Sequence, residues 1–359
     1  MNPPSRSMPS PNGFVSSPAR GRWLVLLAAL LWSSSGFFAK APWFDSWPAV
    51  TLAFWRAAFA CVILLPMVRR PRWSWKLIPT VLTFVIMNYT YITALVEGSP
   101  ANAIWMQATS PIWVLLVGVF CLGEKADGRD WLLLACCVVG IGLILVCEWR
   151  AEHQQAELQQ AEPALTGQQQ AGQQGVVEAN TGDQSVAGME SEDRNPSADA
   201  GGRKETAKSG IRPVLYGIAS GVFYAGVVLS LRQLRDFDSA WLVGLNHLGT
   251  AVILGPLVFR SGPWPADPFQ WTVLAAFGMF QMGLPYVLFA RGLREIPGHE
   301  ASGIGLLEPL LMPLWVLVAW GIRPAWWTIA GGGFILCGLL FKYAGTLRRS
   351  SSCSSQSLD

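Results

Sequence analysis

The sequence predicts an all-α polytopic membrane protein, with ten transmembrane helices arranged as two inverted five-helix repeats and both termini in the cytoplasm. Three observations predict this fold class. Of the 359 residues, 52% are hydrophobic and 14% are charged, whereas a soluble domain has about 25% charged residues. Several apolar segments reach the roughly 20 residues that span a bilayer as a helix. The basic residues of the short connecting loops, finally, lie almost entirely on one side of the membrane.

The first half begins with a polar segment rich in Pro and Ser. Residues 1–22 contain too little apolar surface to fold alone and are predicted to form a disordered cytoplasmic N-terminus. The next segment resembles the apolar part of a signal peptide. Its apolar character continues past Phe37, however, and it has a counterpart in the second half, which favours a transmembrane helix. The spans predicted for this half are Trp23–Ala41, Pro48–Val68, Leu77–Val96, Ala101–Leu122 and Trp131–Cys147.

A polar segment built of Gln, Glu, Ala, Gly and Ser separates the two halves. Residues 151–210 contain no aromatic residue, so the segment 149–210 is predicted to be a disordered linker. Five apolar segments follow it, and residues 347–359 are predicted to form a cytoplasmic tail. The spans of the second half are Val214–Leu231, Ala240–Phe259, Trp271–Gly292, Gly298–Trp320 and Trp326–Tyr343.

The loops predict the orientation of these helices. Lys and Arg concentrate in the cytoplasmic loops of membrane proteins. With the N-terminus in the cytoplasm, the short outside loops hold only Lys40, Arg260 and Arg323, and the other basic residues of the short loops lie inside. This bias predicts that both termini are cytoplasmic and that the linker lies outside the cytoplasm.

The two halves are related by an internal repeat. A shift of 198 residues, without a gap, aligns Ala94–Leu116 with Gly292–Leu314 and brings Glu97 onto Glu295 and Pro111 onto Pro309. Five spans is an odd number, so the second copy crosses the membrane upside down. Inverted repeats of this kind are typical of secondary transporters, whose binding site lies near the midplane between the copies.

Several motifs within these repeats resemble the EamA family of the drug/metabolite transporter superfamily. They are WSSSGFFAK in the first span, SPIWVLLVGVFCLGEK followed by LLLACCVVGIGLIL, and LLEPLLMPLWVLVAWG followed by GGGFILCGLL. The resemblance implies a first EamA repeat at residues 23–148 and a second at 211–346. The chain departs from the family pattern in its long linker and in Trp320–Arg323, which replaces the second LGE and leaves Glu124 without a symmetric partner.

Two ionisable residues lie deep in predicted spans, where charged groups are costly and usually functional. Glu308 lies about 15 Å into the ninth span and Arg56 about 12 Å into the second, at 1.5 Å per residue. Ala301 and Gly305 share the face of Glu308, and such small residues favour close helix contact, so this face is predicted to point inward. Glu308 is interpreted as a substrate- or proton-binding group, as a structural residue, or as the partner of Arg56 in an ion pair.

Two prolines predict symmetric breaks in the backbone. Pro111 removes the hydrogen bond to the carbonyl of Gln107, and Pro309 removes the bond to the carbonyl of Gly305. Such breaks are tolerated in a membrane where protein or water satisfies the free groups. Ser110 is the repeat partner of Glu308, so the predicted site is asymmetric in charge.

Other polar residues within the spans are candidates either for ligand contact or for hydrogen bonds between helices. The candidates for the substrate cavity are Glu308, Gln107, Ser110, Asn88, Tyr89, Trp32, Gln281 and Tyr286. Structural or gating roles are expected for Arg56, Pro111, Pro309, Gly305 and His247.

The sequence contains no motif for catalysis or for metal binding. HExxH, GxSxG and Walker A motifs are absent, which argues against an enzyme and against ATP-driven transport. Six of the seven cysteines lie in apolar spans, no CxxC occurs, and only three histidines are present, so no metal site and no cofactor are expected.

These observations predict a secondary transporter, an exporter of amino-acid-like or other small organic solutes that works by alternating access. The alternatives are a flippase for a lipid or lipid-linked sugar and a non-transporting membrane interaction protein. The expected location is the plasma membrane, the inner membrane of a bacterium. The expected partners are the small-molecule substrate and the bilayer, with no nucleic acid. The sequence leaves the oligomeric state open. It also leaves open whether a proton is coupled to transport, since the first span lacks the glutamate on which small multidrug relatives rely.

Overall fold

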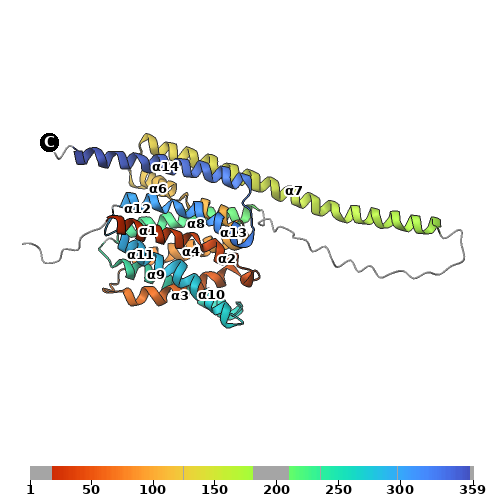
Figure 1. Ribbon diagram of the computed structural model, residues 1–359, viewed down its shortest axis with the longest axis horizontal. Coiled ribbons are helices and arrows are strands. Elements are labelled where there is room, and N and C mark those ends of the chain that lie inside the picture. The colour runs from red at the N-terminus through yellow and green to blue at the C-terminus, as the bar shows by residue number, and fades with distance from the viewer. Residues whose placement is uncertain (1–17, 124, 181–209, 235, 297, 356–359) are drawn as a thin grey trace, which may run out of the picture.

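Ten apolar helical segments, five from each half of the sequence, lie side by side in the computed structural model (Figure 1). The model describes residues 18–123, 125–180, 210–234, 236–296 and 298–355. Within these ranges, nine helical segments are long and apolar enough to cross a membrane, and the tenth, Trp326–Lys342, is shorter. The predicted all-α membrane fold is confirmed.

The first repeat contains seven α-helices for its five spans, because two spans are interrupted. The first span is divided into α1 (Pro18–Ser33) and α2 (Ser35–Ala39), and the fourth into α5 and α6. The other elements of this repeat are η1 (Pro42–Phe44), α3 (Ala49–Leu64), η2 (Leu65–Met67), α4 (Leu77–Glu97), α5 (Pro100–Gln107), α6 (Ser110–Leu122) and α7 (Gly128–Asn180).

The second repeat is interrupted in its third and fourth spans. A π-helical turn, η3 (Met279–Gly283), joins α10 to α11, and Leu306 separates α12 from α13. The elements are α8 (Ile211–Arg232), α9 (Ser239–Ser261), α10 (Pro268–Gly278), α11 (Leu284–Gly292), α12 (Gly298–Gly305), α13 (Leu307–Trp320) and α14 (Trp326–Ser355).

The structure differs from the sequence prediction at the segment that follows the fifth span. Helix α7 continues to Asn180 and extends beyond the bundle (Figure 1), so residues 149–180 are helical rather than disordered. Ala, Gln, Glu and Leu, which dominate this segment, are good helix formers and propagate a helix that has already begun. Helix α14 likewise continues to Ser355, through part of the predicted tail, and α1 begins at Pro18, within the predicted N-terminal segment. Residues 1–17, 181–209 and 356–359 lie outside the described residues.

The two repeats are interleaved rather than placed next to each other. The first span of each repeat packs against the third and fourth spans of the other: α1 against α11, α12 and α13, and α8 against α4, α5 and α6. The second spans pair through α3 and α9, and the fifth and tenth spans through α7 and α14. This exchange of helices places residues of both repeats around one centre.

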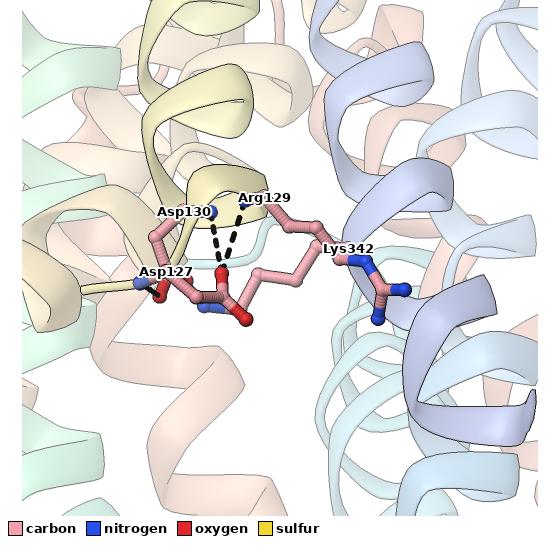
Figure 2. A network of polar contacts seen from close by, with 4 residues as sticks. All are labelled: Asp127, Arg129, Asp130 and Lys342. Carbon is pink, nitrogen blue, oxygen red and sulfur yellow. Dashed lines mark hydrogen bonds and ion pairs between the residues drawn. The ribbon is translucent and has the colours of Figure 1, made fainter. Parts of the chain in front are cut away.

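The start of α7 is fastened to α14 by a polar network (Figure 2). The Asp127 carboxylate accepts hydrogen bonds from the backbone N–H groups of Arg129 (3.0 Å) and Asp130 (3.1 Å), and the Asp130 carboxylate accepts one from the Asp127 N–H (3.0 Å). This reciprocal arrangement satisfies helix-end donors in the manner of a capping box. Lys342 of α14 donates to Asp130 and joins the two helices.

Candidate functional site

The fourth and ninth spans are interrupted at equivalent positions. Helix α5 ends at Gln107 and α6 begins at Ser110, whereas α12 ends at Gly305 and α13 begins at Leu307. Ala108 and Leu306, one in each interruption, are related by the repeat shift of 198 residues. Pro111 and Pro309 stand in the first turn of α6 and α13, where a missing N–H breaks no helical hydrogen bond. The helix breaks therefore lie where the sequence predicts them.

Each break packs closely against the first span of the other repeat. A Cβ atom added to Gly221 of α8 would lie 2.7 Å from the Met106 carbonyl oxygen at the first break. One added to Gly36 of α2 would lie 2.8 Å from Val316 of α13, after the second break. Glycine allows such close approach of helices in a membrane. The first span of each repeat therefore lies in close contact with a broken helix of the other repeat.

Arg56 of α3 lies in the centre of the bundle and is only 2% exposed. Its guanidinium lies over the rings of Tyr91 (5.8 Å to the centroid) and Phe277 (5.4 Å), and its Nη2 donates to the Met282 sulfur at 3.5 Å. Its Nε and Nη1 have no hydrogen-bond partner among the described residues. A buried cation is therefore held by aromatic rings and a weak sulfur acceptor, with two nitrogens free to donate.

Gln281 lies on the π-helical turn η3, next in the chain to Met282, whose sulfur accepts the hydrogen bond from Arg56. Its Nε2 donates to the Trp32 carbonyl oxygen at 3.1 Å, while its Oε1 is buried and receives no hydrogen bond from the described residues. The Trp32 ring in turn contacts Tyr286 edge to face, with centroids 5.1 Å apart. Single π-helical turns occur frequently at functional sites, because the widened turn displaces side chains from the regular helical face.

His247 and Asn88 complete this group of polar residues. The His247 ring is fully buried between Phe84 (4.9 Å) and Tyr286 (5.9 Å), and neither ring nitrogen has a partner in the described part of the chain. Asn88, also fully buried, lies four residues after Phe84 and three before Tyr91, so all three share one face of α4. Both amide atoms of Asn88 lack a partner as well.

We call these side chains the central cluster: Trp32, Arg56, Asn88, His247, Gln281 and Tyr286, with the neighbouring Phe84, Tyr91 and Met282. Four of its members carry buried polar atoms without partners in the described structure. Each such atom costs about 1–3 kcal/mol when it is left unsatisfied. Buried polar groups in proteins nearly always have a partner, so the cluster is the candidate site for water or a polar solute.

Glu308 lies in the first turn of α13 and is partly exposed. The N-terminal end of a helix favours a carboxylate because its free N–H groups carry partial positive charge. Glu308 is close enough to Arg56, Tyr91 and Tyr286 to interact with them electrostatically. The direct ion pair with Arg56 that the sequence leaves open is not formed: no nitrogen–oxygen distance between these two described residues falls within 4.0 Å.

Three of the predicted cavity residues lie away from the central cluster. Tyr89 lines a groove of about 470 Å³ on the other face of α4 and contacts the Tyr216 ring, with centroids 6.5 Å apart. Gln107 lies at the first helix break, where its carbonyl faces Gly221. Ser110 is buried in the first turn of α6. None of these three shares a described contact with the central cluster.

Tyr91 and Met282 contact Arg56, but neither was among the residues predicted for the cavity. Tyr91 provides a ring beneath Arg56 and its hydroxyl shares a 2.9 Å hydrogen bond with the Ser35 hydroxyl. Its helical spacing of three residues from Asn88 was a usable signal, because it puts both on one face. Met282 gave no such signal, since its role depends on the π-helical turn, which the sequence does not reveal.

The two ends of the bundle carry matching ion pairs. We call the end at which α1 begins the α1 end, and the end at which α8 begins the α8 end. At the α1 end Arg20 pairs with Glu295 at 3.8 Å, and at the α8 end Arg212 pairs with Glu97 at 3.6 Å. Glu97 and Glu295 are repeat partners, and both arginines lie at the start of the first span of a repeat.

Each end has a second polar contact between helices. At the α1 end, Arg22 of α1 pairs with Glu300 of α12. At the α8 end, the buried Glu148 of α7 accepts hydrogen bonds from Asn102 Nδ2 (2.7 Å), Trp327 Nε1 (2.9 Å) and the Gly210 N–H (3.2 Å). The Asn102 carbonyl accepts from the Thr328 hydroxyl at 2.7 Å, which ties α5 and α7 to α14. Glu148 was not predicted as a site residue, because it lies at the boundary of the expected span.

A bundle of two inverted five-helix repeats, broken in its fourth and ninth spans around a buried polar centre, defines a class of multi-pass membrane proteins built from interleaved halves. Comparison with known proteins places the chain more narrowly. The model of the EamA-like transporter family matches residues 19–146 and 211–343, so the chain belongs to this family and is a multi-pass membrane protein. The resemblance seen in the sequence is confirmed.

Individual proteins of known sequence or structure are also similar to this chain. An uncharacterized transporter of Archaeoglobus fulgidus is 28% identical over 134 residues, which are 36% of this chain and 47% of that protein. The chain thus matches about half the length of this relative. A crystal structure of another protein has a TM-score of 0.53 at 15% identity, over 91% of this chain and 96% of the other, and supports the fold alone.

Proposed function

We propose that this protein is a secondary transporter that exports small metabolites, amino-acid-like or other small organic solutes, by alternating access and without ATP. The central cluster carries this proposal. It places Arg56, Asn88, His247 and Gln281, with buried and unpartnered polar atoms, between the two repeats. A transported polar solute would form hydrogen bonds with these atoms while it is bound, and water would do so when the solute has left.

The matching contacts at the two ends support alternating access. A transporter of this kind opens its site to one side while the other side stays closed. Arg20–Glu295 joins α1 to the turn after α11, and Arg212–Glu97 joins α8 to the last residue of α4, at opposite ends of the bundle. Opening either end would separate one pair and leave the other intact.

A groove at the α1 end supports export. It has a volume of about 400 Å³ and reaches Leu307, the residue before Glu308. The charge bias of the loops supports a cytoplasmic location for this end, and the membrane that we propose is the inner membrane of a bacterium. Solute taken up through this groove would come from the cytoplasm. The groove is lined by Ala19, Arg22, Trp23, Leu26, Glu300, Ile304 and Leu307.

A lipid flippase, the alternative function, would need an opening from the bilayer to the site. The second groove, which contains Tyr89 and Leu254, has an apolar lining suited to an acyl chain, but it shares no residue with the central cluster in the described structure. This separation favours a water-soluble solute over a lipid.

Uptake by proteoliposomes tests the proposal. Purified protein is reconstituted, and flux of radiolabelled amino acids, nucleosides and amphipathic cations is compared with that in empty vesicles. We expect at least one solute to move faster with protein and Asn88→Ala to reduce this flux at least tenfold, since Asn88 is fully buried in the cluster. Gln233→Ala, an exposed position after α8, is the control. Equal flux in vesicles with and without the protein, for amino acids, nucleosides and amphipathic cations alike, would contradict the proposal.

A further inference from the structure

We infer that the second groove, which contains Tyr89 and Leu254, holds an anionic phospholipid of the bilayer. Its phosphate lies at Arg260, its glycerol esters at the Thr51 hydroxyl and one acyl chain along the apolar wall. The lipid is a bound component of the protein rather than its cargo, because the groove shares no residue with the central cluster in the described structure. The inference goes beyond the proposed function and does not depend on it.

The second groove extends along one leaflet of the bilayer. It lies where α9 packs against α3 and α4, and α3 and α9 lie side by side (Figure 1). Its lining on α9 extends from Leu254 to Gly262, which is about 12 Å along a helix. The hydrocarbon of one leaflet is about 15 Å thick, half that of the bilayer. The groove therefore matches the depth to which an acyl chain enters its own leaflet.

The wall of the groove is apolar and opens toward lipid. Leu254 is buried and forms its inner side, whereas Leu257 on the same helix is 57% exposed. Val50 and Pro48, at the start of α3, complete this wall. Water gains no hydrogen bonds from apolar side chains, and an empty groove forfeits dispersion contacts. An acyl chain from the surrounding bilayer supplies those contacts.

The Thr51 hydroxyl is a buried polar group that faces this apolar groove without a partner. Thr51 is fully buried, lines the groove, and has no hydrogen bond to its Oγ1 from the described residues. The threonines of α4 each donate to a backbone carbonyl one turn earlier. Thr51 lacks this option because it lies in the first turn of α3, where no helical carbonyl precedes it.

Gly262 keeps the space beside this hydroxyl open. A Cβ atom added to Gly262 would lie 3.1 Å from Thr51 Oγ1, so even a methyl group would enter that space. A hydroxyl can donate one hydrogen bond, and an ester carbonyl of a phospholipid can accept it. Because Thr51 lies near the start of its helix, its depth is that of the glycerol region rather than of the chain ends.

Arg260 provides a positive charge at the mouth of the groove. It lies in the last turn of α9, between Leu257 and Gly262, both of which line the groove. Its side chain is exposed, and no carboxylate of the described residues lies within 4.0 Å of it. A guanidinium binds phosphate through two parallel hydrogen bonds. Arg260 is therefore available to the phosphate of a lipid in this leaflet.

The charges around the groove favour a headgroup with a net negative charge. Arg212, at the same end of the bundle, is engaged by Glu97 at 3.6 Å and lies 5.7 Å above the Tyr216 ring. That ring contacts Tyr89 and so borders the groove. No acidic residue lines the groove in the described structure, so the ammonium of a zwitterionic headgroup finds no partner there. Phosphatidylglycerol, which lacks an ammonium, complements Arg260 better.

Three lipids with the same acyl chains test the inference on the purified full-length protein. Phosphatidylglycerol carries the phosphate alone, phosphatidylethanolamine adds an ammonium, and diacylglycerol lacks the phosphate. The protein is stripped of lipid in detergent, and native mass spectrometry measures the affinity of the first lipid bound. We expect phosphatidylglycerol to bind roughly fivefold more tightly than phosphatidylethanolamine and roughly tenfold more tightly than diacylglycerol.

Matched variants assign the parts of the site. Leu257→Trp fills the groove and should abolish tight binding, whereas Val252→Trp, at an exposed position of the same helix outside the lining, should not. Arg260→Gln should remove the preference for phosphatidylglycerol over diacylglycerol, whereas Arg323→Gln, at another exposed position, should preserve it.

The hydroxyl is tested by the nearly isosteric change Thr51→Val, which should weaken all three lipids by roughly fivefold. Unfolding temperatures without lipid show whether each variant is folded. A second measurement needs no variant: phosphatidylglycerol with a diazirine in one acyl chain is photo-crosslinked to wild type, and the modified peptides are mapped. We expect the crosslinks to concentrate on the end of α9 and the start of α3.

Several outcomes would overturn the inference. Crosslinks spread evenly over all membrane-facing helices would show only the ordinary contact of a membrane protein with its bilayer. Equal affinity for phosphatidylglycerol in Leu257→Trp and Val252→Trp would remove the groove from the site. Equal affinity of wild type for phosphatidylglycerol and diacylglycerol would remove the phosphate and Arg260. None of these results affects the proposed transport function, which is measured separately as solute flux.

Discussion

The two ends of the bundle are built from corresponding positions but are closed by different chemistry. The contacts that join α1 to the other repeat at the α1 end are ion pairs of largely exposed arginines: the side chain of Arg20 is 69% exposed and that of Arg22 is 58%. The α8 end has a similar exposed pair, Arg212 with Glu97, but also the network around Glu148, which is only 3% exposed. The repeat thus preserves the ion pair at each end, and one end adds a buried network.

This difference predicts how easily each end opens. Exposed ion pairs contribute little to stability, because water screens the charges and the long side chains lose freedom when they pair. Separating a buried carboxylate from its donors is far more costly, because the donors and the carboxylate lose partners in a medium that offers no replacement until water arrives. The α1 end should therefore open more readily than the α8 end.

The largest effect is expected from Glu148→Ala, which removes the centre of the buried network. The substitution leaves the Asn102, Trp327 and Gly210 donors without their acceptor. We expect a loss of about 3 kcal/mol in the free energy of unfolding. Thermal unfolding in detergent, followed by tryptophan fluorescence, measures it. Glu157→Ala, on the exposed part of the same helix, is the control and should change stability by less than about 0.5 kcal/mol. Equal unfolding temperatures of the two variants would refute the difference between the ends.

A smaller effect is expected from Asp238→Ala at the α1 end, outside the membrane spans. The Asp238 carboxylate accepts hydrogen bonds from the backbone N–H groups of Arg69 (2.9 Å), Arg70 (3.2 Å) and Ala240 (2.9 Å). Burial opposes ionisation of this carboxyl group, but the backbone donors outweigh burial and hold its pKa below the usual value. Loss of this cap should cost about 1 kcal/mol at neutral pH.

The pH dependence of Asp238 follows from the direction of its shift. Because the pKa is lower in the folded than in the unfolded protein, the stabilisation is fully present above the unfolded value of about 4 and is lost as the pH falls through the folded value. The difference in unfolding temperature between wild type and Asp238→Ala should therefore shrink below about pH 4. A difference that stays constant from pH 7 to pH 3 would show that the carboxylate charge is not involved.

The sequence predicts the fold of this protein better than its site. Span lengths, loop charges and the shift of 198 residues depend on local composition, so the helices and the two breaks at Ala108 and Leu306 follow from the sequence. The central cluster depends on which helices pack together. Gln107 and Tyr89 are as polar as Gln281 and Asn88, yet only the latter two face the centre. Only tertiary packing and the π-helical turn separate the two groups.

The smallest effect on stability, and the sharpest comparison of the two ends, is expected from the matched pair Glu97→Gln and Glu295→Gln. Each removes one carboxylate charge from an exposed ion pair, so both variants should unfold at nearly the temperature of wild type.

The two variants should open the centre of the bundle to reagents from opposite sides of the membrane. In a chain with alanine at all seven cysteine positions and with Ser35→Cys beside Tyr91, a membrane-impermeant maleimide is applied to each side of sealed vesicles. Glu97→Gln should speed labelling from the α8 side, and Glu295→Gln from the α1 side, each on the order of threefold. Because the α1 end lacks the Glu148 network, Glu295→Gln should have the larger effect of the two. Faster labelling from the same side in both variants would mean that the two ion pairs do not act as separate closures, and would leave the inverted repeat without a role in gating.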